Sequence, residues 1–180
     1  EQAQELGITP SAILLEPVAR NTAAAISAAA VFIRLRFGAE AVIHVLASDH
    51  AVEIDDNYRW SIMAAAEAAS AGRLVTFGIT PTAPETGYGY VEAGAPLGGG
   101  VLSVASFVEK PDRARAEAMI TAGNHFWNSG TFMLAAGTFL DEVAGLAPET
   151  FAAAEGAVDK SRADLDFVRL DETSFSSAPN

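Results

Sequence analysis

The apolar and polar residues of this chain define two kinds of segment that alternate. Short apolar runs bounded by proline or glycine are typical of buried strands, and they occur at 12–15, 41–48 and 74–79. Longer alanine-rich segments lie between them, at 23–37 and about 55–71, and are long enough for helices. A strand–helix–strand–helix–strand order predicts right-handed crossovers and a parallel sheet.

Capping residues mark where these helices begin and end. Thr22 is expected to cap the helix that starts at Ala23, and Gly38 is placed to end it. Asp55 opens the next helix, which stops at Gly72. The helix boundaries therefore follow from local sequence alone.

The second half of the chain changes character. Residues 90–93 and 101–109 flank a Gly-Gly-Gly turn and are typical of a hairpin, and Asp112 is expected to cap a helix that ends near 122. A further strand is predicted at 130–135, and 137–170 is expected to be mostly helical. Together these segments predict an α/β fold, a three-layer α/β/α sandwich with a mostly parallel sheet.

Composition narrows the class of protein. Half of the 180 residues are hydrophobic and 19% are charged, which is typical of a globular domain. No apolar run approaches the roughly 20 residues of a membrane span. The net charge of −12 argues against nucleic-acid binding, and the absence of cysteine is compatible with a cytoplasmic setting. The opening EQAQELG is typical of the last turn of a helix and indicates a fragment of a longer protein.

Polar clusters follow the ends of several predicted strands. They are Glu16–Thr22, Ser48–His50, Pro81–Tyr90 and Glu109–Pro111. Ligands of α/β sheets bind beyond the carboxyl ends of the strands. The four clusters therefore predict a single cleft.

The first cluster leads into a helix N-terminus, whose free N–H groups suit an anion or the edge of a base. Asn21 offers an acceptor and donors, and Arg20 is a fork-shaped donor. A cap with a surface arginine explains the same residues equally well. Asp49 follows the second strand and could hold magnesium, which prefers one or two carboxylates plus substrate phosphates; capping of the next turn is the alternative.

The later clusters combine charge with aromatic rings. Glu109 and Lys110 are neighbours, so they reach one ligand only where the strand is irregular; a solvated ion pair is the alternative. Asn128 suits a hydroxyl-rich ligand, although it could simply bond the backbone of a turn. In PETGYGYVEAG, the interleaved glycines and tyrosines fit either a hairpin corner or the floor and walls of a pocket.

The segments LLEPVARNTAAAI, VLASDH, LVTFGITPTAPETGYGYVEAG, FVEKPD and FWNSGTFM, in this order, resemble the mannose-1-phosphate guanylyltransferases of the sugar nucleotidyltransferase family. The resemblance extends to about Pro148, with VLASDH in place of the family's VLPADH. It implies a Rossmann-like sheet of the nucleotide-diphospho-sugar transferase type. It further implies that the chain is one piece of a catalytic domain, without the family's glycine-rich loop and C-terminal segment.

The resemblance also implies an activity and its partners. GMP passes from GTP to mannose 1-phosphate with Mg²⁺, giving GDP-mannose and pyrophosphate for nucleotide-sugar and polysaccharide biosynthesis. The family's functional residues map to nucleotide-binding Pro17, Arg20, Asn21 and Thr22, sugar-binding Gly87, Tyr88, Glu109 and Asn128, phosphate-binding Lys110 and metal-binding Asp49. On this mapping the tyrosines wall the sugar, and the catalytic residues are Asp49 and Lys110.

Several alternatives stay open at this point. A related transferase would use dTTP or UTP with glucose 1-phosphate, and a homologue without activity would only bind nucleotide sugars. A dinucleotide oxidoreductase is disfavoured because no GxGxxG joins the first strand to its helix. Homo-oligomerisation is left open, and the 180 residues alone are expected not to turn over.

Overall fold

A computed structural model describes residues 5–179 and divides the chain into two compact units. Unit 1 comprises the described residues of Glu1–Ala41 and Ala136–Asn180, and unit 2 comprises Val42–Ala135. No helix in the described part of the chain is both long and apolar enough to cross a membrane. The predicted helix end before Gly7 lies mostly outside the described residues, and Gly7 itself has a φ of 69°.

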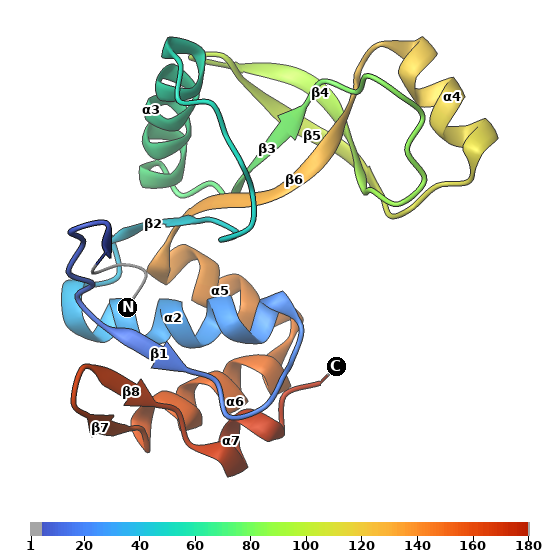
Figure 1. Ribbon diagram of the computed structural model, residues 1–180. Helices are drawn as coiled ribbons and strands as arrows, with labels where there is room; N and C mark the ends of the chain where they lie inside the picture. The colour runs from blue at the N-terminus through green and yellow to red at the C-terminus, as the bar shows by residue number, and fades with distance from the viewer. Residues whose placement is uncertain (1–4, 180) are drawn as a thin grey trace. The chain divides into compact units, whose positions relative to one another are not determined.

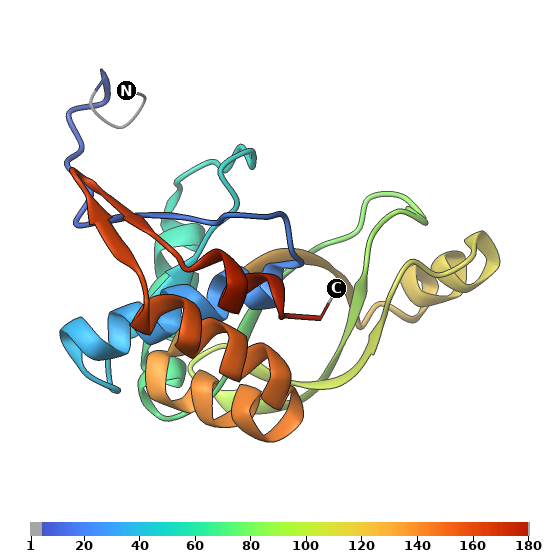
Figure 2. The same ribbon diagram turned by 90° about the horizontal axis from the view of Figure 1, so that it is seen from below.

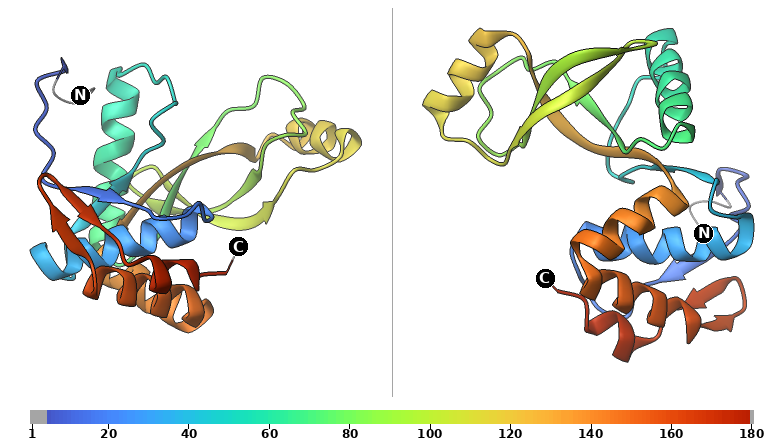
Figure 3. Two further views of the ribbon diagram at one scale, coloured as in Figure 1. Left: turned by 60° about the horizontal axis from the view of Figure 1, so that its bottom comes forward. Right: turned by 180° about the vertical axis from the view of Figure 1, so that it is seen from behind.

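Unit 2 is a five-stranded sheet with a helix at each end (Figure 1). Its elements are β2 (Val42–Val45), α3 (Asp56–Ser70), β3 (Val75–Ile79), β4 (Tyr90–Gly98), β5 (Val101–Val108), α4 (Arg113–Ala122) and β6 (His125–Ala135). The long β4–β5 ribbon twists between α3 and α4 (Figure 3), and α4 is joined to it by the loop at Asp112. The hairpin predicted for these two strands is confirmed.

β6 organises this sheet because it pairs with three other strands. β2, β3 and β4 all run antiparallel to it. At Phe132, β2 and β3 lie on opposite edges of β6, and at Trp127, β3 and β4 do so. β2 and β4 therefore share one edge of β6 at its two ends.

Two small apolar clusters hold the helices of unit 2 to the sheet. Ala65 and Ala69 of α3 pack on Met133 of β6. Ala116 and Met119 of α4 pack with Tyr90, which is fully buried. The alanines let each helix approach the strands closely, and that fixes the part of the sheet where β4 begins.

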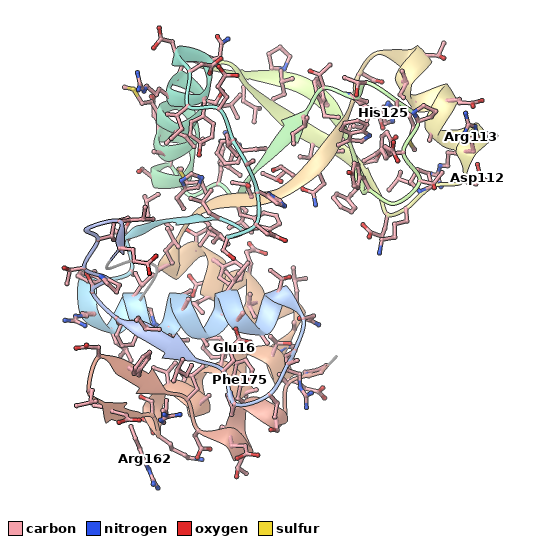
Figure 4. All side chains as sticks on the ribbon, viewed as in Figure 1. Glu16, Asp112, Arg113, His125, Arg162 and Phe175 are labelled. Carbon is pink, nitrogen blue, oxygen red and sulfur yellow. The ribbon has the colours of Figure 1, made fainter. Side chains whose placement is uncertain are left out.

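Unit 1 is mainly helical. Its elements are β1 (Ile13–Leu15), α2 (Thr22–Phe37), α5 (Ala136–Leu146), α6 (Pro148–Asp159), β7 (Arg162–Asp164), β8 (Phe167–Arg169) and α7 (Glu172–Ser176). Small side chains line the contact between α2 and α6, with Ala28 and Ala157 almost fully buried. β8 pairs parallel with β1 and antiparallel with β7 (Figure 2). Phe175 of α7 is fully buried in this unit (Figure 4).

The predicted α/β class is confirmed, but the predicted mostly parallel sheet agrees only loosely with the observed strand pairing. β2 and β3 do run in the same direction, but β6 returns between them, so both pair with an antiparallel neighbour. Among the described residues, the only directly paired parallel strands are β1 and β8.

Two local expectations need correction. Asn21, rather than Thr22, caps α2, because its Oδ1 accepts a hydrogen bond from the Ala23 N–H at 3.1 Å. The last predicted strand starts earlier, at His125. The expectation that 137–170 is mostly helical is confirmed by α5 and α6, with the short β7–β8 hairpin after them.

Candidate functional site

Four residues of three chemical kinds form a row across the sheet of unit 2. Gly78 of β3 is paired with Asn128 of β6. The Asn128 backbone N–H donates to the Gly89 carbonyl at 2.8 Å, just before β4 begins. Glu109 completes the row, because its Oε2 would lie 2.9 Å from a Cβ built on Gly89. An amide, a bare backbone and a carboxylate are therefore adjacent.

The row borders a gap along one edge of β6. β2 pairs with residues 132–135 on this edge and β4 pairs with 125–127. On this edge, residues 129–131 pair with neither strand and Asn128 is joined to the β4 side by its hydrogen bond to Gly89, so the strand pairing is interrupted between β4 and β2. The later polar clusters thus lie around a break in strand pairing, at the start of β4 and the end of β5.

The two tyrosines of the Gly-Tyr-Gly-Tyr segment have different roles. Tyr88 is half exposed and stands edge-on to Trp127, with 5.3 Å between the ring centroids. It is therefore available as a wall. Tyr90 is completely buried against α4, so the expectation that both tyrosines face a ligand is wrong for Tyr90.

Glu109 and Lys110 reach the same side through a backbone irregularity. β5 ends at Val108, and Lys110 has a φ of 43°, in the left-handed region that non-glycine residues rarely adopt. Lys110 Nζ lies 3.7 Å from Glu109 Oε1. Both side chains are well exposed, so this pair contributes little to stability. A strained backbone at a residue whose side chain gains little from packing is typical of functional positions.

The carboxamide of Asn128 is oriented by its neighbours. Its Oδ1 accepts from the Thr76 hydroxyl at 3.0 Å and from the Gly130 N–H at 3.3 Å. No acceptor among the described residues is bonded to its Nδ2. Asn128 therefore has two N–H donors available for a ligand oxygen. The alternative, that Asn128 bonds the backbone of a turn, holds in part, because Oδ1 accepts from the Gly130 N–H, but the residue lies within β6.

Asp49 lies in the exposed turn after β2. Because β2 and β3 run in the same direction, this turn follows the same end of the sheet as the loop that carries Tyr88. No hydrogen bond or ion pair joins the Asp49 carboxylate to another described residue. No group of three or more possible metal ligands occurs in the described part of the chain. The described residues around Asp49 therefore do not form a metal site by themselves, and its assignment to a metal stays a prediction.

In unit 1, the loop 16–22 connects β1 to α2. Asn21 caps the helix with its side-chain oxygen, and the first turn of α2 contains no acidic residue. The Arg20 guanidinium donates to the Ser176 carbonyl at 2.6 Å, which ties the loop to the end of α7. Pro17 and Thr22 are exposed. The helix N-terminus thus keeps the positive character expected of an anion site.

The structure brings Tyr88, Glu109, Lys110 and Asn128 together in unit 2, and gathers Pro17, Arg20, Asn21 and Thr22 in one loop of unit 1. A Cβ on Gly87 would meet no atom within 4 Å, so that residue stands in open space. A single cleft formed by all four clusters stays a prediction. Sequence reasoning singled out Gly89 within the Gly-Tyr-Gly-Tyr segment but missed Thr76. The hydroxyl in the otherwise apolar LVTFGI strand was the available signal for Thr76.

In unit 2, a cation beside hydroxyl-matched donors and acceptors suits a phosphorylated sugar. In unit 1, a helix N-terminus with no acidic residue in its first turn suits a nucleotide phosphate. The sequence agrees: residues 1–173 match the nucleotidyl transferase family model, and the chain belongs to that family.

Particular relatives can be named. The chain is 50% identical over all of its length to the mannose-1-phosphate guanylyltransferase of Sinorhizobium fredii, and 47% identical to the xanthan biosynthesis protein XanB of Xanthomonas campestris. It covers 35% and 38% of those proteins. Each of these relatives is therefore much longer than the chain.

A solved structure is also similar. It is described as mannose-1-phosphate geranyltransferase from Thermus thermophilus, with a TM-score of 0.79 and 35% identity, covering 98% of this chain and 49% of that one. A structure described as mannose-6-phosphate isomerase from Helicobacter pylori has a TM-score of 0.74 and 34% identity, covering 91% and 62%.

Proposed function

We propose that the protein carrying this chain transfers GMP from GTP to mannose 1-phosphate. A phosphate oxygen of the sugar attacks the α-phosphorus of GTP, the bond from that phosphorus to the β-phosphate oxygen breaks, and pyrophosphate leaves as GDP-mannose forms. The names of the relatives that match the whole chain support this reaction. Enzymes of this kind need no covalent intermediate, because they act by positioning and by offsetting charge.

The observation that carries the proposal is the row formed by Asn128, Gly89 and Glu109, with Lys110 next to it. A hexose presents hydroxyl groups that both donate and accept hydrogen bonds. Asn128 Nδ2 supplies donors, the Glu109 carboxylate supplies an acceptor, and bare backbone at Gly89 allows a close approach. Lys110 adds the compact positive charge that suits a phosphate.

The remaining residues receive roles on the same basis. Tyr88 walls the sugar, and Gly87 lets the chain pass beside it. The nucleotide is held by the loop before α2, namely by Pro17, Arg20, Asn21 and Thr22. Because Arg20 also donates to Ser176, we assign it to holding this loop in place for the nucleotide as well as to supplying positive charge.

Magnesium would be held by Asp49. The exposed carboxylate without a protein partner supports one direct ligand, and the triphosphate and water would provide the others. When bound, the ion offsets the charge that develops on the leaving pyrophosphate. We place this reaction in the cytoplasm, where GTP and sugar phosphates are available, and its product would feed polysaccharide biosynthesis.

The test is a substrate comparison with the protein expressed from its complete reading frame. Pyrophosphate release is measured with GTP and mannose 1-phosphate, and separately with dTTP or UTP and glucose 1-phosphate, each with magnesium and with a chelator. We expect magnesium-dependent release with the first pair. Release only with the second pairs would replace the substrate assignment, and release with none would identify a homologue that binds nucleotide sugars without reacting.

A further inference from the structure

Thr76 of β3 lies beside the residue that we assign to the sugar but belongs to none of the polar clusters. Its hydroxyl is 3.0 Å from Asn128 Oδ1 and 3.3 Å from the carbonyl oxygen of Thr131. The side chain is partly buried, so these contacts are shielded from water. Thr76 therefore connects two strands at the point where Asn128 must be oriented.

The sheet is irregular at this place. Thr76 pairs with Phe132 and Gly78 pairs with Asn128, so a step of two residues on β3 faces a step of four on β6. The extra residues form a bulge, in which Gly130 has a φ of 70° and Ser129 Oγ accepts from the Thr131 N–H at 3.1 Å. Bulges re-aim side chains next to functional sites. Here the bulge turns the Asn128 carboxamide toward Thr76.

The orientation of that carboxamide decides what it offers to a ligand. With Oδ1 toward Thr76 and the Gly130 N–H, both Nδ2 hydrogens are left without a bonded acceptor among the described residues. After a 180° rotation, Nδ2 would face the Gly130 N–H, donor against donor, and the ligand would meet an acceptor. The Gly130 N–H, which can only donate, therefore selects the donor-outward form, while the Thr76 hydroxyl, which can donate or accept, adds the shorter hydrogen bond that holds the carboxamide in place.

We propose that Thr76 is a positioning residue for the sugar: its hydroxyl holds the Asn128 carboxamide in place, in the orientation set by the Gly130 N–H, so that the amide donors can meet the sugar hydroxyls. This inference rests on the proposed function, since it needs a sugar at Asn128. Thr76 itself touches Asn128 and Thr131 and acts only through Asn128. Without its hydroxyl, only the Gly130 N–H would oppose rotation of the amide.

The experiment compares Thr76→Val, which keeps the β-branched shape, with Thr76→Ser, which keeps the hydroxyl. Thr121→Val is the matched control, because Thr121 also donates to a backbone carbonyl but is exposed on α4 and makes no hydrogen bond to Asn128. All are made in the protein from the complete reading frame. Binding of GDP-mannose and of GDP is measured by calorimetry, together with KM and kcat.

We expect Thr76→Val to weaken GDP-mannose about 3- to 10-fold, the effect of one neutral hydrogen bond, with GDP unchanged. In Thr76→Val, KM for mannose 1-phosphate should rise by a similar factor. Thr76→Ser and Thr121→Val should both bind and react like the wild type. In an Asn128→Ala background the Thr76→Val change should have no further effect, because the two residues act as one unit.

Three results would overturn the inference: equal weakening of GDP and GDP-mannose, full additivity with Asn128→Ala, or wild-type binding by Thr76→Val. If Thr76→Val does not fold, Thr76→Ala is measured in its place against the same control. If the wild type proves to use glucose 1-phosphate, the proposed function fails. The comparison of Thr76→Val, Asn128→Ala and the double variant is then made with that sugar. The two failures are therefore separable.

Discussion

Replacing Gly89 with alanine tests the row at the centre of the site. A Cβ at this position would lie 2.9 Å from Glu109 Oε2 and 2.9 Å from Phe107 Cζ. Carbon–carbon contacts are favourable only at about 3.5–4.0 Å, so the Phe107 ring must move by roughly half an ångström or more. Both neighbours are more than half exposed and can turn outward.

Gly89→Ala should have a large effect on binding of the sugar and a small effect on the stability of the fold. Since the displaced groups face water, the free energy of unfolding should change by less than about 1 kcal/mol. The Glu109 carboxylate, however, leaves the sugar. A hydrogen bond to a charged group contributes about 1.5–3 kcal/mol, which corresponds to a roughly 10- to 150-fold loss of kcat/KM for mannose 1-phosphate.

Pyrophosphate release at varied mannose 1-phosphate, together with thermal melting, measures both quantities. Gly145→Ala is the control, because a Cβ there meets nothing within 4 Å and the residue lies in α5 of unit 1. This control should keep wild-type kinetics. Wild-type kcat/KM in Gly89→Ala would show that Glu109 does not contact the sugar, and a collapse of the melting temperature would show that the clash disturbs the sheet instead.

Three further outcomes are expected. Lys110→Ala should raise KM for mannose 1-phosphate more than KM for GTP, and Lys110→Arg should restore it only in part because a planar fork fits a point-charge site poorly; unchanged mannose 1-phosphate kinetics would refute the role. Burial lowers the pKa of His44. Below pH about 6.5, the unfolded chain therefore binds a proton at this residue more readily than the folded chain does. The folded chain therefore loses stability through this group as the pH falls below that value. His44→Leu should reduce the change of the urea unfolding midpoint between pH 7 and pH 5. An unchanged pH dependence of the midpoint would exclude His44 as the cause. Phe175→Ala should cost about 3–5 kcal/mol of unfolding free energy, because the ring is fully buried; a loss below about 1 kcal/mol in urea unfolding would contradict that packing.

Local sequence predicted the elements whose ends are set locally. α2, α3 and α4 begin and end within about two residues of their expected bounds, because caps such as Asp112 and Gly38 act on the adjacent turn. The β4–β5 hairpin follows for the same reason, since its glycine turn joins neighbouring strands.

Features that depend on distant partners could not be predicted in this way. β6 passes through Asn128–Gly130, which look like a turn, because pairing with β3 and β4 on either side accommodates a bulge. The β7–β8 hairpin forms against β1, more than 140 residues earlier in the chain. Burial of Tyr90 depends on α4, and spacing alone gives no reason to separate it from Tyr88.

The sequence identified candidate site residues where a polar or charged side chain follows the end of a predicted strand. Glu109 and Lys110 were expected to need a broken strand, and the positive φ of Lys110 supplies it. Thr76 was overlooked because a single threonine is ordinary in a strand, and its relation to Asn128 exists only in the folded sheet.

The central claim is that the interrupted edge of β6 binds the sugar. A crystal structure of the protein from its complete reading frame with GDP-mannose tests it most directly. We expect the mannose ring beside Tyr88, with hydroxyl oxygens within hydrogen-bond distance of Asn128 Nδ2 and the Glu109 carboxylate, and the adjacent phosphate near Lys110. A sugar bound elsewhere on the sheet, with the interrupted edge of β6 empty, would contradict this account.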